Sequence, residues 1–550
     1  MSVLLPATTL STISTPSNST RILPPIPLNK KQPSSSTRHK LGLNSAVKTW
    51  TFTRPTHRCR CCLAMPVEPT TTTSSSQLQD GCLHSRAYWV SKSVIAWNVD
   101  MLDGLCYLYA SKAAALSFSN SGIQGHDVEI KLDGDDNRLP VNVIDKFPHL
   151  QDYNTFKLPP ALDAKSLLKC QLVIAVFSSD GKCINATGLQ LPGVLDELFS
   201  YDGPLGAVFS NDAVSVHLWA PTAQDVQALI YSDPCGVEPI DIVKLEEANG
   251  VWTSIGPRSW EGCYYVYEVS VYHPSTLQIE KCIANDPYAR GLSADGNRTL
   301  LVNLESDGLK PEGWDDLAVE KPDLLSFSEI SIYELHVRDF SASDDTVHPD
   351  IRGRYLAFTS QDSAGILHLK RLSDAGLTHV HLLPTSQFAG VEDEKYKWKC
   401  VDTHVLESLP PDSAEQQAHI TAIQNEDGYN WGYNPVLWGV PKGSYASNPI
   451  GPSRIVEFRK MVQALNRIGV RVVLDVVYNH VHGSGPFDEN SVLDKIVPGY
   501  YLRRNTDGFI EHSTCVNNTA SEHVMVERLI LDDLLSWAVN YKVPFLWRSF

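Results

Sequence analysis

Short runs in which apolar and polar residues alternate fill residues 80–305. Three such runs stand out, at positions 214–218, 226–230 and 265–271. A period of two predicts strands that bury one face, and turn residues such as Asp233-Pro234 separate these runs. Short strands at close intervals predict a small β-sandwich over 205–305. Residues 80–204 share the rhythm, with Leu168–Phe177 as the clearest strand, and are predicted to form a separate β-rich domain.

The hydrophobic pattern changes at about residue 325. Three strands are predicted, at Ile330–Val337, Thr378–Leu383 and Val470–Val477. The third is nearly all apolar, as a parallel strand buried on both faces should be. Each of the three precedes a stretch with helical periodicity, at Gly365–Ala375, at Arg454–Ile468, and from a capping box at Thr519-x-x-Glu522 to about Asn540. This order predicts three βα units of a parallel α/β fold over 325–543. The connections after the second and third strands are long, and such folds place their chemistry there.

Composition limits the classes of partner. The 550 residues carry 46 Lys and Arg against 63 Asp and Glu, a net charge of −17. Residues 68–550 hold all 63 acidic side chains but only 37 basic ones, so this part carries −26. A nucleic-acid or membrane-surface binder needs a basic face, and no stretch of about 18 apolar residues could cross a bilayer. We therefore expect no nucleic acid and no membrane among the partners.

Residues 1–67 differ from the remainder, with nine Lys or Arg, nine Ser, ten Thr and no acidic residue. An Arg- and Ser-rich, acid-free leader without a hydrophobic signal core is typical of organelle transit peptides, and the high Ser and Thr content favours a plastid. A disordered basic tail is the alternative. We expect a plastid transit peptide at 1–67, a low-complexity linker at 68–79, and localisation in the chloroplast or amyloplast stroma.

Metal and cysteine signals are weak. Nine of the twelve Cys residues lie beyond the leader without a CxxC pair, so neither a disulfide framework nor a zinc site is predicted. Two acidic clusters, Asp344-Asp345 and Glu392-Asp393-Glu394, are candidates for calcium. Without ligand spacing they are more typical of solvated loops, so no cofactor or metal is assigned.

Four motifs carry a family resemblance. Asp475-Val-Val-Tyr-Asn-His480, at the end of the third predicted strand, resembles the first signature of the α-amylase superfamily, glycoside hydrolase family 13. Tyr429-Asn-Trp-Gly-Tyr-Asn-Pro435 resembles the motif of its pullulanase branch, and Tyr333-Glu-Leu-His-Val-Arg-Asp339 resembles that branch's first barrel strand. Asp286–Asp295 resembles the end of a family-48 carbohydrate-binding module. Over about residues 85–543 the chain thus resembles the pullulanase-type starch-debranching enzymes.

The resemblance implies a (β/α)8 TIM barrel behind the β-domains and retaining hydrolysis of α-1,6-glucosidic linkages in starch, limit dextrins and pullulan. In that mechanism a carboxylate attacks the anomeric carbon while a carboxylic acid protonates the leaving oxygen. The resemblance also implies that His480 donates an N–H to a sugar hydroxyl, that Tyr433 offers an aromatic platform, and that Asn479 organises the loop. Asp475 would orient an arginine beside the nucleophile rather than react itself.

The residue pattern alone leaves plainer roles open. An Asp at the end of a buried strand is commonly a loop or helix cap, and a Tyr such as Tyr433 is commonly part of the core. Trp219 lies among apolar strand residues and is expected in the core. Trp252 and Trp260 lie near turns of the predicted sandwich, where a glucan-stacking role is open but unassigned.

The chain departs from the family pattern after Val543. The family has an Asp-Gly-Phe-Arg-Phe-Asp strand there, with the nucleophilic Asp and the arginine that Asp475 should meet, whereas here Pro-Phe-Leu-Trp-Arg-Ser-Phe550 follows. We interpret 544–550 as an aberrant tail of a truncated or mispredicted product, with a short isoform as the alternative, and expect the third strand to keep an open edge. Both catalytic carboxylates are then absent. Two hypotheses stand: a debranching enzyme by family, or a non-catalytic glucan-binding fragment.

Overall fold

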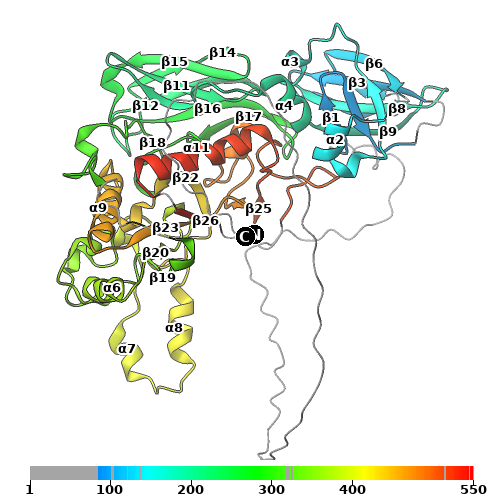
Figure 1. Ribbon diagram of the computed structural model, residues 1–550. Helices are drawn as coiled ribbons and strands as arrows, with labels where there is room; N and C mark the ends of the chain where they lie inside the picture. Colours follow the sequence, from blue (N-terminus) through cyan, green and yellow to red (C-terminus); the bar gives the residue numbers. More distant parts are fainter. Residues whose placement is uncertain are drawn as a thin grey trace, which may run out of the picture. The chain divides into compact units, whose positions relative to one another are not determined.

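The computed structural model describes residues 84–100, 104–119, 122–135, 138–317, 323, 326–512, 516–543 and 545–548. The predicted transit peptide and linker, residues 1–67 and 68–79, lie outside these ranges. The described chain forms three successive modules, coloured from blue to cyan, in green, and from light green to red in Figure 1. Within these ranges no helix combines the length and the apolar character needed to cross a bilayer.

The first module is a closed β-barrel. Its strands follow each other in the order β1 (Ala87–Ser91), β2 (Val94–Trp97), β7 (Asn154–Lys157), β6 (Val128–Asp135), β3 (Leu105–Ser111), β8 (Gln171–Phe177) and β9 (Cys183–Gln190). A parallel pairing of β1 with β9 closes the barrel. The module also contains β4 (Ser117–Ser119), β5 (Gly122–Gln124), α2 (Val141–Lys146), α3 (Ala164–Leu167) and α4 (Pro192–Phe199). Large apolar side chains such as Trp89 and Trp97 fill its core.

The strand predicted at Leu168–Phe177 begins later than expected, because a short helix precedes it. The Asp163 carboxylate accepts a hydrogen bond from Ser166 N at 3.4 Å and caps the first turn of α3. Leu168 N still donates to Ala164 O at 3.1 Å, so the helical turn extends past the predicted start of the strand. The extended backbone of β8 therefore starts only at Gln171.

The second module is the predicted β-sandwich. One sheet has the order β10 (Gly206–Phe209), β11 (Ala213–Trp219), β15 (Val251–Pro257) and β14 (Glu246–Ala248). The other has the order β13 (Asp241–Lys244), β12 (Ala223–Tyr231), β16 (Tyr264–His273) and β17 (Gln278–Ala284), and β18 (Thr299–Leu300) also pairs with β16. The alternating positions Val214, Val216, Val226, Ala228 and Tyr267 are all buried. Their period of two thus marks the core face, as predicted.

The third module is built on a parallel sheet with the order β19 (Ile332–Leu335), β20 (His379–Leu382), β23 (Arg471–Val476) and β26 (Phe545–Arg548). Successive strands are connected through α6 (Ala364–Asp374), α9 (Ser453–Arg467) and α11 (Val524–Asn540). Gly376 and Gly469, at φ +110° and +93°, follow the ends of the first two helices as predicted. The expected order of β-domains followed by part of a parallel α/β domain, with three βα units, is confirmed.

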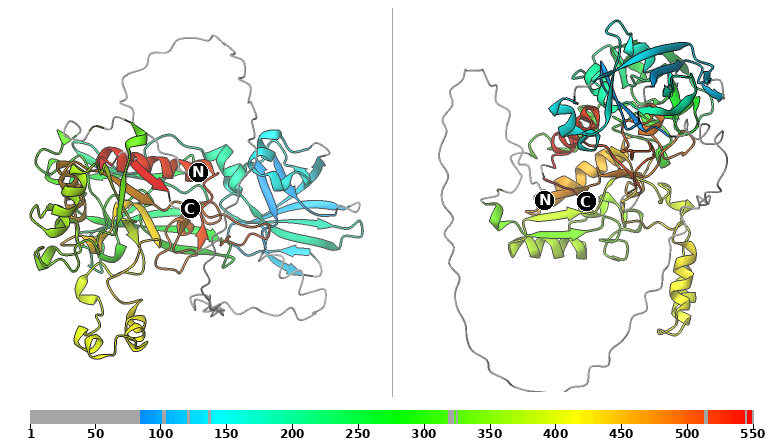
Figure 2. Two further views of the ribbon diagram at one scale, coloured as in Figure 1. Left: turned by 60° about the horizontal axis from the view of Figure 1, so that its bottom comes forward. Right: turned by 90° about the vertical axis from the view of Figure 1, so that its right-hand side faces the viewer.

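The connections after β20 and β23 are long, as the sequence predicts. The first contains β21 (Ser386–Phe388), α7 (Thr403–Ser408), α8 (Glu415–Ile423) and β22 (Pro435–Pro441), and β21 pairs with β22. Helices α7 and α8 extend away from the sheet (Figures 1 and 2). The second connection contains β24 (His480–Val481), α10 (Leu493–Ile496) and β25 (Asn517–Asn518). These two connections bring together the residues of the candidate site.

The expectation that the third strand keeps an open edge is wrong. Phe545–Arg548 forms β26 and pairs in parallel with β23, with Val473 opposite Phe545 and Val476 opposite Arg548. The segment Phe-Leu-Trp contains two aromatic residues, which favour an extended strand, and the unpaired backbone groups at the edge of β23 offer it a hydrogen-bond ladder. Within the described residues the sheet therefore has four strands, with β19 and β26 at its edges.

Helix α11 does not begin at the predicted capping box. Thr519 instead donates its hydroxyl to Tyr478 O, and Glu522 pairs with Arg503 at 2.5 Å. Both side chains are thereby used by partners outside the helix. Consequently α11 starts later, at Val524, behind His523.

Buried polar contacts tie the sandwich to the third module. Arg290, in the segment after β17, pairs with Asp533 of α11 at 2.7 Å. Arg459 of α9 donates to Leu304 O and Leu309 O, both at 2.9 Å. Burial raises the pKa of the Asp533 carboxyl, although Arg290 acts in the opposite direction. Since a single cluster of buried apolar residues also runs through the modules, the third module is anchored on the sandwich.

Candidate active site

Three of the four motifs, those at 333–339, 429–435 and 475–480, meet at the carboxyl ends of β19, β20 and β23. Asp475 is the second-last residue of β23. His480 is the first residue of β24, the next strand along the chain. Tyr433 lies shortly before β22, on the connection that follows β20. In parallel α/β folds this edge of the sheet is where loops assemble a binding site. The structure thus brings together residues that are distant in the sequence.

Tyr433 and Asp475 form the central contact of this site. The Tyr433 hydroxyl donates a hydrogen bond to Asp475 Oδ2 at 2.5 Å. Asp475 is only 4% exposed, whereas Tyr433 is half-buried, so the phenol is fixed at its polar end while part of its ring stays accessible. In the register of the sheet, Asp475 lies opposite Trp547, one residue before Arg548. An arginine therefore follows on the neighbouring strand at nearly the level of Asp475.

His480 is held by the same loop. Its Nε2 donates a hydrogen bond to Tyr433 O at 2.9 Å, because a carbonyl can only accept. Its Nδ1 is buried and has no hydrogen-bond partner among the described residues. Burial lowers the pKa of His480 more than the bond to Tyr433 O raises it. The bond to Tyr433 O fixes the ring beside the loop that carries Tyr433, and the contact of His480 with a sugar hydroxyl stays a prediction.

A glycine shapes the loop that carries Tyr433. Gly432 adopts φ +90°, and a Cβ there would lie 2.8 Å from Pro384 O. Gly432 N donates to Asn430 Oδ1 at 2.8 Å, and Asn434 O accepts from Ala389 N at 2.9 Å. The heptapeptide 429–435 therefore lies tightly against the backbone that follows β20, and only glycine fits at its close approach.

Two residues of the site were given no role in the sequence analysis. His336, just after β19, donates through Nε2 to Asn430 O at 2.9 Å, and its ring centroid lies 5.3 Å from that of Tyr429. Trp431 is 59% exposed, and its ring centroid lies 6.5 Å from that of Tyr433. His336 belongs to the motif at 333–339 and Trp431 to the motif at 429–435. Their position in these motifs is the sequence feature that could have identified them. Trp431 is the exposed aromatic face next to Tyr433.

Asn479 contributes through its backbone. Its carbonyl oxygen accepts a hydrogen bond from Thr519 N at 3.0 Å and so ties the start of β24 to β25. The side-chain Oδ1 is buried without a hydrogen-bond partner among the described residues. The role of the Asn479 side chain in organising the loop stays a prediction.

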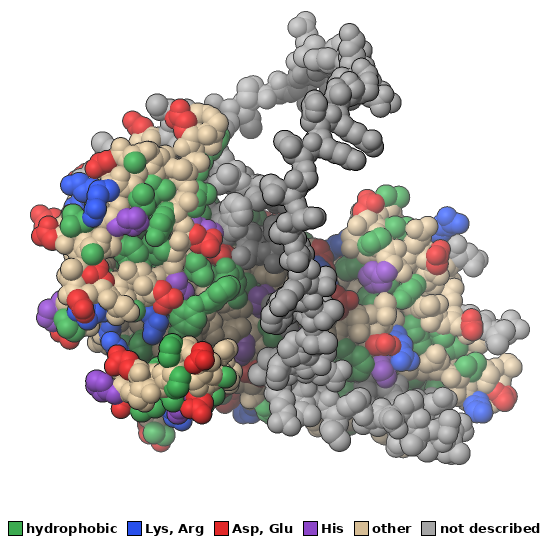
Figure 3. Space-filling model, turned by 90° about the horizontal axis from the view of Figure 1, so that it is seen from below, with side chains coloured by type: hydrophobic (Ala, Val, Ile, Leu, Met, Phe, Trp, Pro, Cys, Tyr) green, Lys and Arg blue, Asp and Glu red, His purple; other side chains and the backbone are tan. Residues whose placement is uncertain are grey.

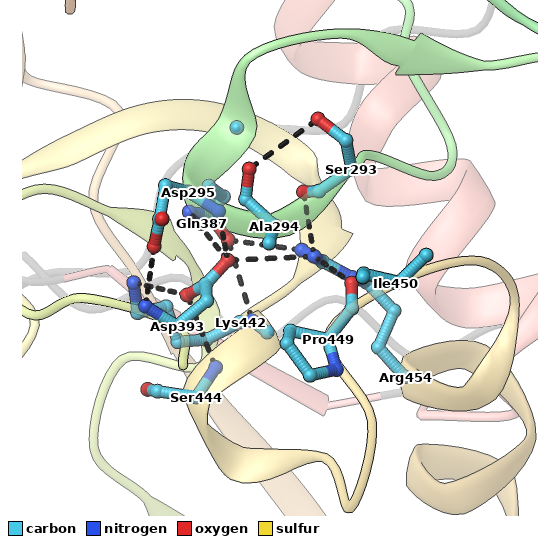
Figure 4. A network of polar contacts seen from close by, with 12 residues as sticks. Ser293, Ala294, Asp295, Gln387, Asp393, Lys442, Ser444, Pro449, Ile450 and Arg454 are labelled. Atoms are coloured by element: carbon cyan, nitrogen blue, oxygen red, sulfur yellow. Dashed lines mark hydrogen bonds and ion pairs between the residues drawn. The ribbon is translucent and has the colours of Figure 1, made fainter. Parts of the chain in front are cut away.

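One of the two acidic clusters is not a solvated loop. Asp393 is fully buried and pairs with Lys442 at 2.6 Å and with Arg454 at 3.4 Å (Figure 4). Burial raises the pKa of Asp393, but the two cations outweigh it and hold that pKa below its ordinary value. Its neighbours Glu392 and Glu394 pair with Lys397 at 3.2 and 3.0 Å. A buried carboxylate is tolerated only when cations compensate its charge, and Lys442 and Arg454 do so for Asp393.

The other cluster, Asp344-Asp345, lies at the surface as expected. Asp345 is 95% exposed and pairs with Arg352 at 3.0 Å, and Asp344 accepts a hydrogen bond from Thr346 N at 2.9 Å. Within the part of the chain that the structure describes, no three or more His, Cys, Asp or Glu side chains are arranged to hold a metal ion.

The tryptophans of the sandwich are structural. Trp219, Trp252 and Trp260 are 2%, 5% and 4% exposed. Trp219 Nε1 donates to Phe199 O at 2.8 Å and Trp252 Nε1 to Ala220 O at 2.9 Å, as buried indoles require. The core position predicted for Trp219 is confirmed, and the other two rings are covered as well.

Comparison with known proteins agrees with this geometry. Residues 84–197 match the Pullulanase N2 domain, and residues 204–289 match Carbohydrate-binding module 48 (Isoamylase N-terminal domain). The protein named "Pullulanase 1, chloroplastic" of Arabidopsis thaliana is 67% identical over 478 residues, which are 87% of this chain and 50% of that protein. The chain belongs to the pullulanase family. Pullulanase of Klebsiella pneumoniae is 36% identical over 505 residues, 84% of this chain and 46% of the relative.

Solved structures of the family show the same architecture. The maltotriose complex of PulA from Klebsiella pneumoniae matches with a TM-score of 0.80 and 35% identity, over 84% of this chain and 53% of that one. The chain spans about half the length of the curated pullulanases it matches. The shared part contains the N2 domain, the carbohydrate-binding module and part of the catalytic domain.

Proposed function

We propose that this chain is part of a pullulanase, the type that in plants is called limit dextrinase, whose function is starch debranching by retaining hydrolysis of α-1,6-glucosidic linkages. The ligand is a branched α-glucan such as starch, a limit dextrin or pullulan. Membership of the pullulanase family supports the activity, and PulA from Klebsiella pneumoniae forms a complex with maltotriose. The observation that carries the proposal is the meeting of Tyr433, Asp475 and His480 at the carboxyl edge of the parallel sheet.

The arrangement suits a neutral sugar. A half-buried Tyr433 ring offers an apolar face to a pyranose, and the exposed Trp431 extends that face. His480, whose ring is held beside Tyr433 through Tyr433 O, is proposed to bind a sugar hydroxyl. Asp475 holds Tyr433 through its hydroxyl and in this role positions the platform rather than reacting.

The 550 residues themselves are proposed to bind glucan without cleaving it. The retaining mechanism needs a nucleophilic carboxylate and an acid about 5–5.5 Å apart. The family motif Asp-Gly-Phe-Arg-Phe-Asp, which carries the nucleophile, does not occur in the printed sequence. Strand β26, with Phe-Leu-Trp-Arg, occupies the place beside β23 without a carboxylate.

The protein is proposed to act in the plastid stroma. A relative at 67% identity is named as chloroplastic, and residues 1–67 contain nine basic and no acidic residues. We expect mass spectrometry of the protein from isolated plastids to find an N-terminus between about residues 55 and 75, because the acid-free composition ends at Glu68. An intact leader on the stromal protein would contradict this proposal.

The mixture of charged and apolar side chains on the surface is compatible with an uncharged glucan ligand. Acidic, basic and apolar side chains are interspersed on the face seen in Figure 3. A neutral polysaccharide needs no single-sign field for capture, unlike a nucleic acid.

Two measurements on the purified chain test the proposal. Reducing-end assays on pullulan should detect no hydrolysis, and calorimetric titration with maltotriose should detect binding. His480→Ala and Tyr433→Phe should each weaken that binding about tenfold, the usual loss when a hydrogen bond worth about 1.4 kcal/mol is removed.

Exposed residues of the same types provide matched controls. His404→Ala on α7, whose side chain is 88% exposed, and Tyr396→Phe, at an 80% exposed residue, should bind like the parent chain. Hydrolysis that survives purification and disappears in His480→Ala would show that the chain is itself an enzyme. Loss of binding in the control variants as well would refute the assignment of the site.

A further inference from the structure

A cavity is lined by residues other than the three central residues of the candidate active site. It has a volume of about 630 Å³, within the range of about 300–1,000 Å³ typical of ligand pockets. The segments after β17 provide one wall through Asn285 and Asn297, and the connection after β23 provides the other through Ser491 and Lys495. Tyr433, Asp475 and His480 do not line it.

Polar groups without partners point to a ligand in this cavity. Lys495 is only 8% exposed, yet its ammonium has no hydrogen bond or ion pair with any described residue. Ser491 is 1% exposed, and its hydroxyl likewise lacks a hydrogen-bond partner within the described ranges. The same holds for His482 Nδ1 on that wall. Buried polar atoms normally have partners, so the Ser491 hydroxyl and His482 Nδ1, together with the unpaired ammonium of Lys495 on the same wall, indicate a polar ligand.

A second lysine that lines the cavity, Lys442, has a full set of ion-pair and hydrogen-bond partners. Lys442 is 1% exposed, pairs with Asp393 at 2.6 Å, and donates to Phe388 O and Val391 O. Lys495 has no such set of acceptors, and burial lowers its pKa. Unlike Lys442, Lys495 therefore has hydrogen-bond donors that a ligand can use.

The charges around the cavity select a neutral ligand. Glu489, Glu426 and Asp427 line it, so an anion such as phosphate would be repelled. The ammonium of Lys495 would repel a cation for the same reason. A polyhydroxylated molecule offers acceptors to Lys495 and Ser491 and donors to the carboxylates and amide oxygens.

The wall after β17 is held in place by the buried network of Figure 4. Asp295 N donates to Asp393 Oδ2 at 2.9 Å, and Arg454 donates to Ser293 O at 3.0 Å. Asn285 Nδ2 donates to Gly296 O at 2.6 Å within the same wall. This wall is therefore preorganised, which reduces the entropy lost when a ligand binds.

We propose that this cavity is a second glucan site, in which Lys495 and Ser491 bind the hydroxyl groups of glucosyl units between the carbohydrate-binding module and the catalytic module. The proposal rests on the proposed function for the chemical class of the ligand. It adds a place where a second segment of a branched chain is held while the first lies at Tyr433.

Titration of the full chain with maltotriose tests the proposal. The parent chain should show two classes of site. Lys495→Met, which keeps the length of the stem, and Ser491→Ala should each weaken one class about tenfold and leave the other. His480→Ala should weaken the other class. Lys244→Met, at a side chain that is 72% exposed, is the matched control and should keep both classes.

The outcomes separate this inference from the proposed function. Two classes that persist unchanged in both Lys495→Met and Ser491→Ala would overturn the second site while the active-site proposal stands. A class of maltotriose-binding site that is lost in Lys495→Met but unaffected in His480→Ala would support the second glucan site, whether or not the binding site at His480 is confirmed. Inorganic phosphate that binds the parent chain, loses affinity in Lys495→Met and does not compete with maltotriose would show an anion site instead and overturn the proposal.

Discussion

Asp295 and Asp393 each accept a hydrogen bond from the other's backbone amide, at 2.9 Å to Asp393 Oδ2 and 2.5 Å to Asp295 Oδ1. One residue ends the sandwich segment, and the other lies between β21 and β22 of the third module. Asp295 holds φ +56°, in the left-handed region that side chains rarely adopt. The reciprocal bonds therefore fix the junction of two modules at the expense of local strain, and they share Asp393 with Lys442 and Arg454.

Asp393→Asn should lower the free energy of unfolding by about 3–5 kcal/mol, the usual cost of leaving buried cations without their partner. Lys442 and Arg454 are 1% and 0% exposed and would keep their charges. The midpoint of urea unfolding measures the effect. Asp350→Asn, whose side chain is 86% exposed, should stay within about 0.5 kcal/mol of the parent chain. Equal stability of the two variants would contradict the role assigned to the network.

Gly432→Ala should cost more than the same change at a glycine with free space. Both Gly432 at φ +90° and Gly181 at φ +83° require the left-handed region, which costs alanine about 1–2 kcal/mol. Only at Gly432 would the new Cβ lie 2.8 Å from Pro384 O, whereas nothing lies within 4 Å at Gly181. We expect Gly432→Ala alone to weaken maltotriose binding, because the loop that carries Tyr433 must shift. Calorimetric titration of both variants compares them.

The sequence predicted much of the fold because most of its elements obey a local rule. The period of two in β11 and β12 and the apolar run of β23 each follow from burial on one or two faces. The capping box at Thr519 and Glu522 failed because Tyr478 O and Arg503, which the sequence does not place nearby, compete for the two side chains. Strand β26 was missed because its four residues gain their structure from the edge of β23.

The candidate site was predictable only as a set of residue types. Motif membership identified Tyr433, Asp475 and His480, but not the bond from His480 to Tyr433 O that holds the ring in place. The cavity at Lys495 left no signal at all, since its walls come from segments about 200 residues apart whose meeting depends on tertiary packing. Long-range pairing of this kind follows from the fold rather than from local pattern.

The stability of the fold should fall between about pH 6.5 and pH 4 because of His379 on β20. Burial lowers the pKa of His379 to about 4, and Arg471 adds to the effect. The unfolded chain binds the proton near pH 6.5, so the contribution is complete above that pH and is lost as the pH falls toward 4. At about 1.4 kcal/mol per pH unit, the loss reaches about 3 kcal/mol.

Urea unfolding measured across that range should show a flatter dependence for His379→Gln than for the parent chain. His404→Gln, at a side chain that is 88% exposed, should keep the parent slope. A parent chain whose stability is constant from pH 7 to pH 4.5 would contradict the assignment of a neutral, buried His379.

An exposed apolar stripe on α11 should make the chain self-associate. Leu531, Leu535 and Val539 are spaced by four residues and are 49%, 59% and 65% exposed, while the opposite side of the helix buries Leu529 and Trp537. Covering such side chains gains about 1.5–3 kcal/mol each, enough for three to hold weak oligomers together. Sedimentation velocity of Leu535→Lys with Val539→Lys should show fewer oligomers at unchanged unfolding midpoint. Leu529→Lys, at a 2% exposed site, should instead unfold the module. A parent chain that remains monomeric at high concentration would contradict the prediction, because the stripe would then be tolerated in water.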